Sequence, residues 1–244
     1  LPNVTWEGPQ TFVSSVPQPP TPKAVDPKGA VSIGWPPVRV GPSRVATNLE
    51  LSLAISGIAL VAFMALHMGL LLSSMVGAAT MDTLASFLER YYLLHSGAPV
   101  LILLIFAHVI LATRKLPNTS RQQLALVKHT RTLWHLDTWM WGVQILTGVA
   151  ILVLVSIHLW IVLTDLPIQA LKSGTRVYGI YLWFYVPFLI LVEAHASAGL
   201  YRIAVKWGLI RRRWAHISFT LWTAIFLGLG FAILVTLYSI GAKP

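Results

Sequence analysis

Charged residues divide the chain into long apolar stretches. Four runs contain no Asp, Glu, Lys or Arg, and a fifth contains a single acidic residue, Glu193. A helix needs about 20 predominantly apolar residues to cross a bilayer. The pattern therefore predicts five transmembrane helices, over residues 50–74, 94–113, 138–164, 179–203 and 215–240. We expect the fold to be all-α, an integral membrane bundle.

The composition supports a membrane protein. Of the 244 residues, 56% are hydrophobic and 11% are charged, and the mean hydropathy is +0.71. A soluble domain carries about 25% charged residues, because its surface must be hydrated. The chain has no cysteine, so disulfides and cysteine-ligated zinc or iron–sulfur centres are excluded within it.

The first 45 residues differ from the rest. They hold ten of the fifteen prolines, and proline removes a backbone donor and interrupts helices. We therefore divide the chain into a proline-rich tail, residues 1–45, and a five-helix bundle, residues 46–244. The composition of the tail fits either a disordered segment or a strap that lies on a partner subunit.

Basic residues indicate how the bundle is oriented. With five spans, the tail and the loops after the second and fourth helices share one side, and 14 of the 18 Lys and Arg residues fall there. Because cytoplasmic loops are enriched in Lys and Arg, we expect the N-terminal tail to be cytoplasmic. Topology and anionic lipid then explain the net charge of +10, and no nucleic-acid partner is expected.

Four of the five predicted helices carry one interior histidine each: His67, His108, His158 and His195. At about 1.5 Å per residue, His67 and His158 lie about 26–31 Å from the cytoplasmic edge. By the same measure, His108 and His195 lie about 9–10 Å from it. The four residues therefore form two pairs at two depths, and each pair joins two different helices.

Two histidines at one depth on different helices suit a b-type haem with two axial imidazoles. Such an iron has no open coordination site, so it transfers electrons and does not bind oxygen. Small residues such as Ser56, Gly57 and Gly148 are available for the two macrocycles to pack against. The alternatives are hydrogen-bonded bundle histidines in a haem-free anchor, or a histidine-lined metal transporter. A transporter would favour ligands clustered at one depth or carboxylates among them.

Four motifs around these histidines resemble a known family. They are AHVILATRKLPNTSRQ from Ala107, HLDTWMWGVQILTG from His135, SIHLWIVLT from Ser156 and VEAHASAGLYRIAVKWG from Val192. In this order they resemble the dihaem cytochrome b anchor of quinol:fumarate reductases and succinate:menaquinone reductases. The resemblance covers roughly residues 50 to 210; the proline-rich tail and the last helix add little to it.

The resemblance implies a role for each histidine pair. His108 and His195 would ligate a proximal haem near the cytoplasmic face and the iron–sulfur partner. His67 and His158 would ligate a distal haem near the outer face. We expect the other four histidines, at helix ends or in loops, to be interfacial: His95, His129, His135 and His216.

The resemblance also implies contacts to the haem propionates. Trp141 and Lys206 match positions that touch the proximal propionates, and Arg176 matches one near the distal propionates. A propionate at a membrane boundary is stabilised by a cation or an indole N–H. For Lys206 and Arg176 the alternative is a cation that reaches the interface with no cofactor contact.

Two carboxylates are candidate catalytic residues. The resemblance links Glu89, on the outer side, to menaquinol oxidation, which releases two protons with two electrons; a solvated loop glutamate paired with Arg90 is the alternative. It also links Glu193 to a proton route across the membrane. Glu193 precedes His195 by two residues, so it does not face the same haem; its alternative role is one structural hydrogen bond.

Taken together, these features predict a five-helix dihaem cytochrome b in the bacterial inner membrane. The resemblance implies that it oxidises menaquinol and passes electrons to an iron–sulfur subunit and an FAD-containing flavoprotein. These partners would reduce fumarate, or the flow would run in reverse from succinate. The family also suggests a dimer of heterotrimers. A cytochrome b anchor of a hydrogenase or formate dehydrogenase is the alternative of the same class.

Overall fold

A computed structural model describes residues 44–116, 119, 124, 128 and 136–243, with side chains in the last range from Trp139 onward. The predicted tail up to residue 43 lies outside these residues, as do His129 and His135. The described ranges are helical with short turns between helices and contain no strand. The prediction of an all-α fold is therefore confirmed.

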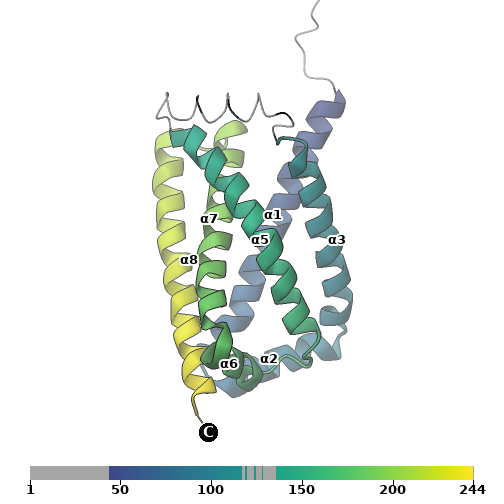
Figure 1. Ribbon diagram of the computed structural model, residues 1–244, viewed down its shortest axis with the longest axis vertical. Coiled ribbons are helices and arrows are strands. Elements are labelled where there is room, and N and C mark those ends of the chain that lie inside the picture. Colours follow the sequence, from purple (N-terminus) through teal and green to yellow (C-terminus); the bar gives the residue numbers. More distant parts are fainter. Residues whose placement is uncertain (1–43, 117–118, 120–123, 125–127, 129–135, 244) are drawn as a thin grey trace, which may run out of the picture. The chain divides into compact units, whose positions relative to one another are not determined.

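Five helices are long and apolar enough to cross a membrane, as the charge pattern predicted. Figure 1 shows them as α1 (Arg44–Leu72), α3 (Leu93–Thr113), α5 (Leu136–Leu163), α7 (Leu182–Lys206) and α8 (Arg212–Gly241). Between 6% and 22% of the most apolar window of each span is buried within the protein. Few residues of these windows are therefore fully buried by the chain itself, and exposed apolar side chains along the spans suit contact with lipid.

The fourth span is longer than predicted, and it is bent. Its helical segment begins with α6 (Ala170–Arg176), continues through η2 (Val177–Tyr181) and joins α7 without a loop. Gly179 departs from helical geometry inside η2, with φ −76° and ψ −113°. A straight helix from Ala170 to Lys206 would measure about 55 Å, far more than the ~30 Å hydrocarbon core. The bend turns α6 across the end of the bundle (Figure 1).

A helix that the charge pattern did not predict, α2 (Ala78–Arg90), follows the short turn η1 (Ser73–Met75). Met81 and Ala85 are buried, and their spacing of four places them on one face of α2. Beside them, Asp82 Oδ1 accepts a hydrogen bond of 2.7 Å from the backbone N–H of Ala170. This bond satisfies a free donor where α6 begins.

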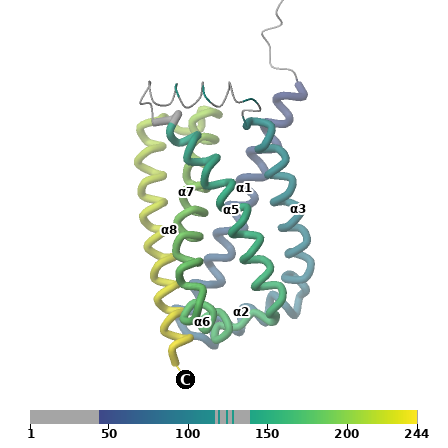
Figure 2. Tube along the Cα trace, in the orientation of Figure 1, coloured from purple at the N-terminus to yellow at the C-terminus, as the bar shows by residue number. Residues whose placement is uncertain are grey.

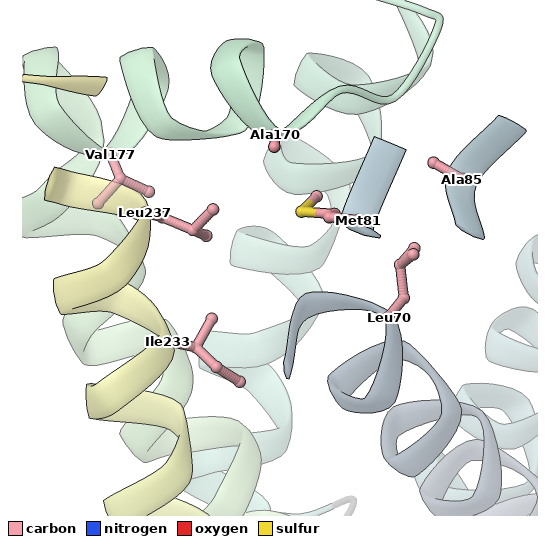
Figure 3. Packing of buried hydrophobic residues seen from close by; sticks show 7 residues of the cluster. All are labelled: Leu70, Met81, Ala85, Ala170, Val177, Ile233 and Leu237. Atoms are coloured by element: carbon pink, nitrogen blue, oxygen red, sulfur yellow. The ribbon is translucent and has the colours of Figure 1, made fainter. Parts of the chain in front are cut away.

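Helices α1, α2, α6 and α8, with η2, meet in a hydrophobic cluster at one end of the bundle (Figure 3). Its buried members are Leu70, Met81, Ala85, Ala170, Val177, Ile233 and Leu237. Gly174 allows the α6 backbone to approach α8, since a Cβ on it would lie 2.8 Å from both Gly241 N and Leu237 O. We call this end of the bundle, which also holds Asp165, the Asp165 end, and the opposite end the Glu50 end.

Helices α1 and α7 each pack against three other spans among the described residues. Helix α7 packs against α1, α5 and α8, and α1 packs against α3, α7 and α8, whereas α3 packs against α1 and α2. Figure 2 traces the same arrangement. Within the described residues, α1 and α5 do not pack along each other, and neither do α3 and α7. Those two helix combinations are the ones that carry the predicted histidine pairs.

Candidate functional site

The structure brings the four interior histidines together as two pairs. The ring centroids of His67 on α1 and His158 on α5 lie 6.0 Å apart. Those of His108 on α3 and His195 on α7 lie 6.5 Å apart. These are the pairs that the depth estimate predicted. Each pair bridges two helices whose backbones are otherwise separate.

Contacts along α1 place the two pairs at different depths. Ser56 contacts His108, whereas His67, eleven residues later on the same helix, faces His158. Eleven residues of helix correspond to about 16 Å along its axis. The His108–His195 pair therefore lies nearer the Glu50 end, and the His67–His158 pair lies nearer the Asp165 end.

The spacing of the rings fits an iron held between two imidazoles. Two metal–nitrogen bonds of about 2.0–2.1 Å in line through the metal place the ring centroids about 6 Å apart. The two centroid separations, 6.0 and 6.5 Å, agree with this value. The absence of close backbone packing between the bridged helices also suits a flat group inserted between them. The residues present therefore fit two bis-histidine haems.

Hydrogen bonds hold both rings of the His108–His195 pair at Nδ1. His108 Nδ1 lies 2.9 Å from Ser56 Oγ, whose own hydroxyl donates to the Leu53 carbonyl at 3.0 Å. His195 Nδ1 lies 3.0 Å from the backbone carbonyl oxygen of Gln144, and a carbonyl oxygen can only accept a hydrogen bond. His195 Nδ1 therefore carries a proton, and its Nε2 keeps its lone pair for a metal. Ser56 Oγ can accept from His108 Nδ1–H in the same way, which would leave His108 Nε2 for a metal.

Two glycines bring neighbouring helices close to these same rings. A Cβ on Gly148 would lie 3.0 Å from His195 Cε1, and one on Gly57 would lie 3.3 Å from His108 Cε1. Both glycines are among the small residues that the sequence offered as packing surfaces for haem. In the structure each one leaves room for an imidazole, so a side chain at either position would displace a predicted ligand.

Aromatic rings surround the His67–His158 pair instead. Phe63 stacks on His67 with centroids 6.0 Å apart and an interplanar angle of 11°. Tyr185 and Phe188 on α7 lie 5.9 and 5.4 Å from the His158 ring. Among the described residues, His158 Nδ1 is buried without a hydrogen-bond partner. Within the part of the chain that the structure describes, ring packing orients this pair.

A carboxylate holds two lysines together at the Glu50 end. Glu50 on α1 accepts a hydrogen bond of 2.6 Å from Lys115 and another from Lys206 on α7. Lys206 is the residue predicted to contact a proximal propionate, and the structure pairs it with Glu50. Trp141, the other predicted contact, is half-buried on α5.

The Asp165 end has a matching arrangement. Asp165 Oδ2 lies 2.6 Å from Arg176, and its Oδ1 lies 2.9 Å from Lys172. The Arg176 guanidinium, followed by the Lys172 ammonium, lowers the pKa of Asp165 below its usual value. Only 12% of the Arg176 side chain is exposed, and it also lies beside Tyr185, a neighbour of His158. Arg176 is therefore close to the pair whose propionates it was predicted to contact.

Comparison with known proteins adds an independent observation. Residues 117–233 match the family described as succinate dehydrogenase/fumarate reductase transmembrane subunit. The fumarate reductase cytochrome b subunits of two Helicobacter pylori strains are 36% identical over 176 residues, which cover 68% of this chain and 69% of each relative. The corresponding subunit of Wolinella succinogenes is 33% identical over the same shares. This chain belongs to the succinate dehydrogenase/fumarate reductase transmembrane subunit family. The family that the four motifs predicted is confirmed.

Glu193 is fully buried in this family member, at the interface of α7 and α8. Ser197 donates a hydrogen bond to its Oε1 and also contacts Thr223 Oγ1 on α8 at 2.8 Å. Its Oε2 has no hydrogen bond of normal geometry among the described residues. Glu193 thus faces α8, whereas His195 faces α3, in agreement with their predicted separation around the helix.

Glu89 lies near the end of α2 and is half-buried. Its side chain makes no ion pair within the described residues, and Arg90 is not paired with it.

The remaining described histidines lie outside the two pairs. His95 is exposed on α3, and His216 Nε2 is 3.1 Å from the Tyr201 hydroxyl. Neither lies in a histidine pair. The site residues that sequence reasoning did not assign are the partners of the ligands and cations, namely Ser56, Gln144, Thr147, Glu50 and Asp165.

Proposed function

We propose that this chain is the membrane anchor of a quinol:fumarate oxidoreductase. In this proposal it binds two b-type haems, oxidises menaquinol and delivers the electrons to an iron–sulfur subunit and an FAD-containing flavoprotein. These partners reduce fumarate to succinate, or the same route carries electrons from succinate to menaquinone. The observation that carries the proposal is the presence of two histidine pairs at two depths, each bridging helices that do not pack together.

The chain's own residues hold the cofactors. His108 and His195 would bind the proximal haem through Nε2, since their Nδ1 atoms are engaged elsewhere. His67 and His158 would bind the distal haem, and Phe63 and Phe188 contact the two imidazole rings that would hold it. When bound, the two haems supply a route for single electrons through the hydrocarbon core.

Cations and acids at the two ends complete the proposed site. Lys206 and Trp141 would contact the proximal propionates, and Arg176 the distal ones. Each cation already has a carboxylate partner, so the propionate would join an existing ion pair. Glu89, half-buried at the end of α2, would accept a proton released by menaquinol. Glu193 would carry a proton between α7 and α8, where Ser197 and Thr223 supply hydroxyls.

The proposed setting is the bacterial inner membrane, with the N-terminal tail on the cytoplasmic side. The iron–sulfur subunit would dock at the Glu50 end, which the sequence predicts to be cytoplasmic and rich in Lys and Arg. Assembly as a dimer of heterotrimers is part of the proposal, carried by the family resemblance.

Haem content and electron transfer test the proposal on the purified three-subunit complex. A pyridine haemochrome assay should give about two b haems per anchor, and a menaquinol analogue should reduce fumarate. A complex without haem, or one with two haems and no quinol-linked fumarate reduction, would contradict it. Glu89→Gln and Glu193→Gln should each abolish quinol-linked turnover while keeping both haems. Fumarate reduction by a reduced dye that bypasses the anchor should stay unchanged.

A further inference from the structure

The two histidine pairs differ at the nitrogen that faces away from the metal. Ser56 reaches from α1 to His108 on α3, and Gln144 reaches from α5 to His195 on α7. Thr147 Oγ1 lies 3.2 Å from the same His195 Nδ1, and its hydroxyl donates to the Val143 carbonyl at 2.7 Å. No described residue makes a hydrogen bond to the ring of His67 or His158.

The chain of donors at Ser56 has a defined direction. Ser56 has one hydroxyl proton, which it gives to the Leu53 carbonyl. Its oxygen then accepts from His108 Nδ1–H when Nε2 is a metal ligand, because the neutral ring carries its one proton on Nδ1. An imidazole whose second N–H is held by an acceptor has a fixed tautomer and is a more basic metal ligand. A more basic ligand stabilises ferric iron relative to ferrous iron and so lowers the midpoint potential of the haem.

We infer that Ser56 is a positioning residue that lowers the midpoint potential of the haem held by His108 and His195. It acts through Nδ1 of His108 and touches neither iron nor substrate. The Gln144 carbonyl plays the same part for His195, and Thr147 supports it. The haem held by His67 and His158 has no such bond among the described residues, so this effect acts on one of the two potentials alone. This inference rests on the proposed function, because it requires haem at the pair.

The experiment compares Ser56→Thr with Ser56→Val in the three-subunit complex, because the two new side chains have the same shape. Thr and Val differ by a hydroxyl against a methyl group, and a helical Thr can donate to the carbonyl three or four residues back, as Ser56 does. In a redox titration followed at the haem α-band, Ser56→Thr should leave both midpoints near the wild type. Ser56→Val should raise one midpoint and leave the other in place. The expected rise is about tenfold in the ratio of reduced to oxidised haem, or about 59 mV for one electron.

Two further variants show which haem has moved and whether the effect is specific. His108→Ala should remove the same transition that Ser56→Val shifts. Ser156→Ala is the matched control, because Ser156 on α5 is exposed and, among the described residues, bonds only to Leu152 O of its own helix. Both midpoints should stay in place in this variant. Thr147→Val should cause a smaller shift than Ser56→Val, since the Gln144 carbonyl still accepts from His195.

The outcomes separate this inference from the proposed function. If each haem has the same midpoint potential in Ser56→Thr as in Ser56→Val, the inference is overturned and the proposed function still stands. Equal shifts of both midpoints in Ser56→Val would also overturn it, because the effect would then come from bundle packing. A wild-type complex without haem would overturn the proposed function, and the inference with it.

Discussion

The two histidine pairs use the same side chain and orient it by different means. Hydrogen bonds to Ser56 and Gln144 orient the His108–His195 pair. Phe63, Tyr185 and Phe188 orient the His67–His158 pair by ring contact. A hydrogen bond fixes both the ring and the position of its proton, whereas ring packing fixes the ring alone. One bundle can thus hold two pairs of the same side chain and give them different electronic surroundings.

Removal of a ligand from either pair is expected to have the largest effect. His195→Ala and His67→Ala should each lower the haem content from about two per chain to about one, because one imidazole alone leaves the iron half-ligated. The pyridine haemochrome assay measures this. His216→Ala is the control, since His216 is engaged with Tyr201, away from both pairs. Full haem content in both ligand variants would contradict the assigned pairs.

Gly148 tests how tightly the His108–His195 pair is enclosed. In Gly148→Ala the new Cβ would lie 3.0 Å from His195 Cε1, so the ring must move, and overpacking of this kind costs about 1–3 kcal/mol. Thermal unfolding should show this loss, and the haem spectrum of one site should change. Gly228→Ala, where a Cβ meets nothing within 4 Å, should instead gain stability through helix propensity. If Gly148→Ala and Gly228→Ala change the thermal stability equally, the His195 ring is not tightly enclosed at Gly148.

Removal of an aromatic contact from the His67–His158 pair should have a smaller effect on the protein. Phe188→Leu removes a ring 5.4 Å from His158, and such contacts contribute about 0.5–1.5 kcal/mol beyond area burial. The electron paramagnetic resonance signal of this haem should broaden as its ligand plane becomes less defined. The signal of the other haem should stay the same. Phe231→Leu, at an exposed position on α8, is the control, and broadening of both signals would contradict separate orientation of the pairs.

The smallest effect concerns pH at the Asp165 end. Because Arg176 and Lys172 lower the pKa of Asp165, its ion pairs stabilise the fold above the unfolded pKa of about 3.9. That stabilisation is lost as the pH falls through the lower folded pKa. Asp165→Asn should therefore lower the melting temperature slightly at neutral pH, and the difference should vanish in acid. A difference that is constant with pH would exclude this ion pair as its cause.

Much of the fold could be predicted because charge is so scarce in the spans. Absence of charged side chains marks a spanning segment directly, so the five helices were evident. Helices α2 and α6 were not predicted, since Asp82, Glu89 and Lys172 give those segments the polarity of loops. They are helical because Met81 and Ala170 are buried in the hydrophobic cluster and Asp82 bonds to the start of α6.

The candidate site could also be predicted only in part. Depth along each helix predicts which histidines meet, because it depends only on distance from a charged boundary. The partners of Nδ1 depend on how each helix is rotated about its axis, which hydropathy does not encode for spans that are apolar all round. Ser56 was therefore visible only as a small residue, although it bonds to His108. The pairing of Glu50 with Lys206 was hidden for the same reason.

Each histidine pair lies between helices that do not pack along each other. A group held by both members of a pair therefore ties together two helices whose backbones do not pack along each other, and its binding free energy adds to that of folding. Newly synthesised chain that lacks haem should then be the form that membrane proteases remove. We expect the amount of anchor in the membrane to follow the rate of haem biosynthesis, with the supply of cofactor acting as a control on respiratory capacity.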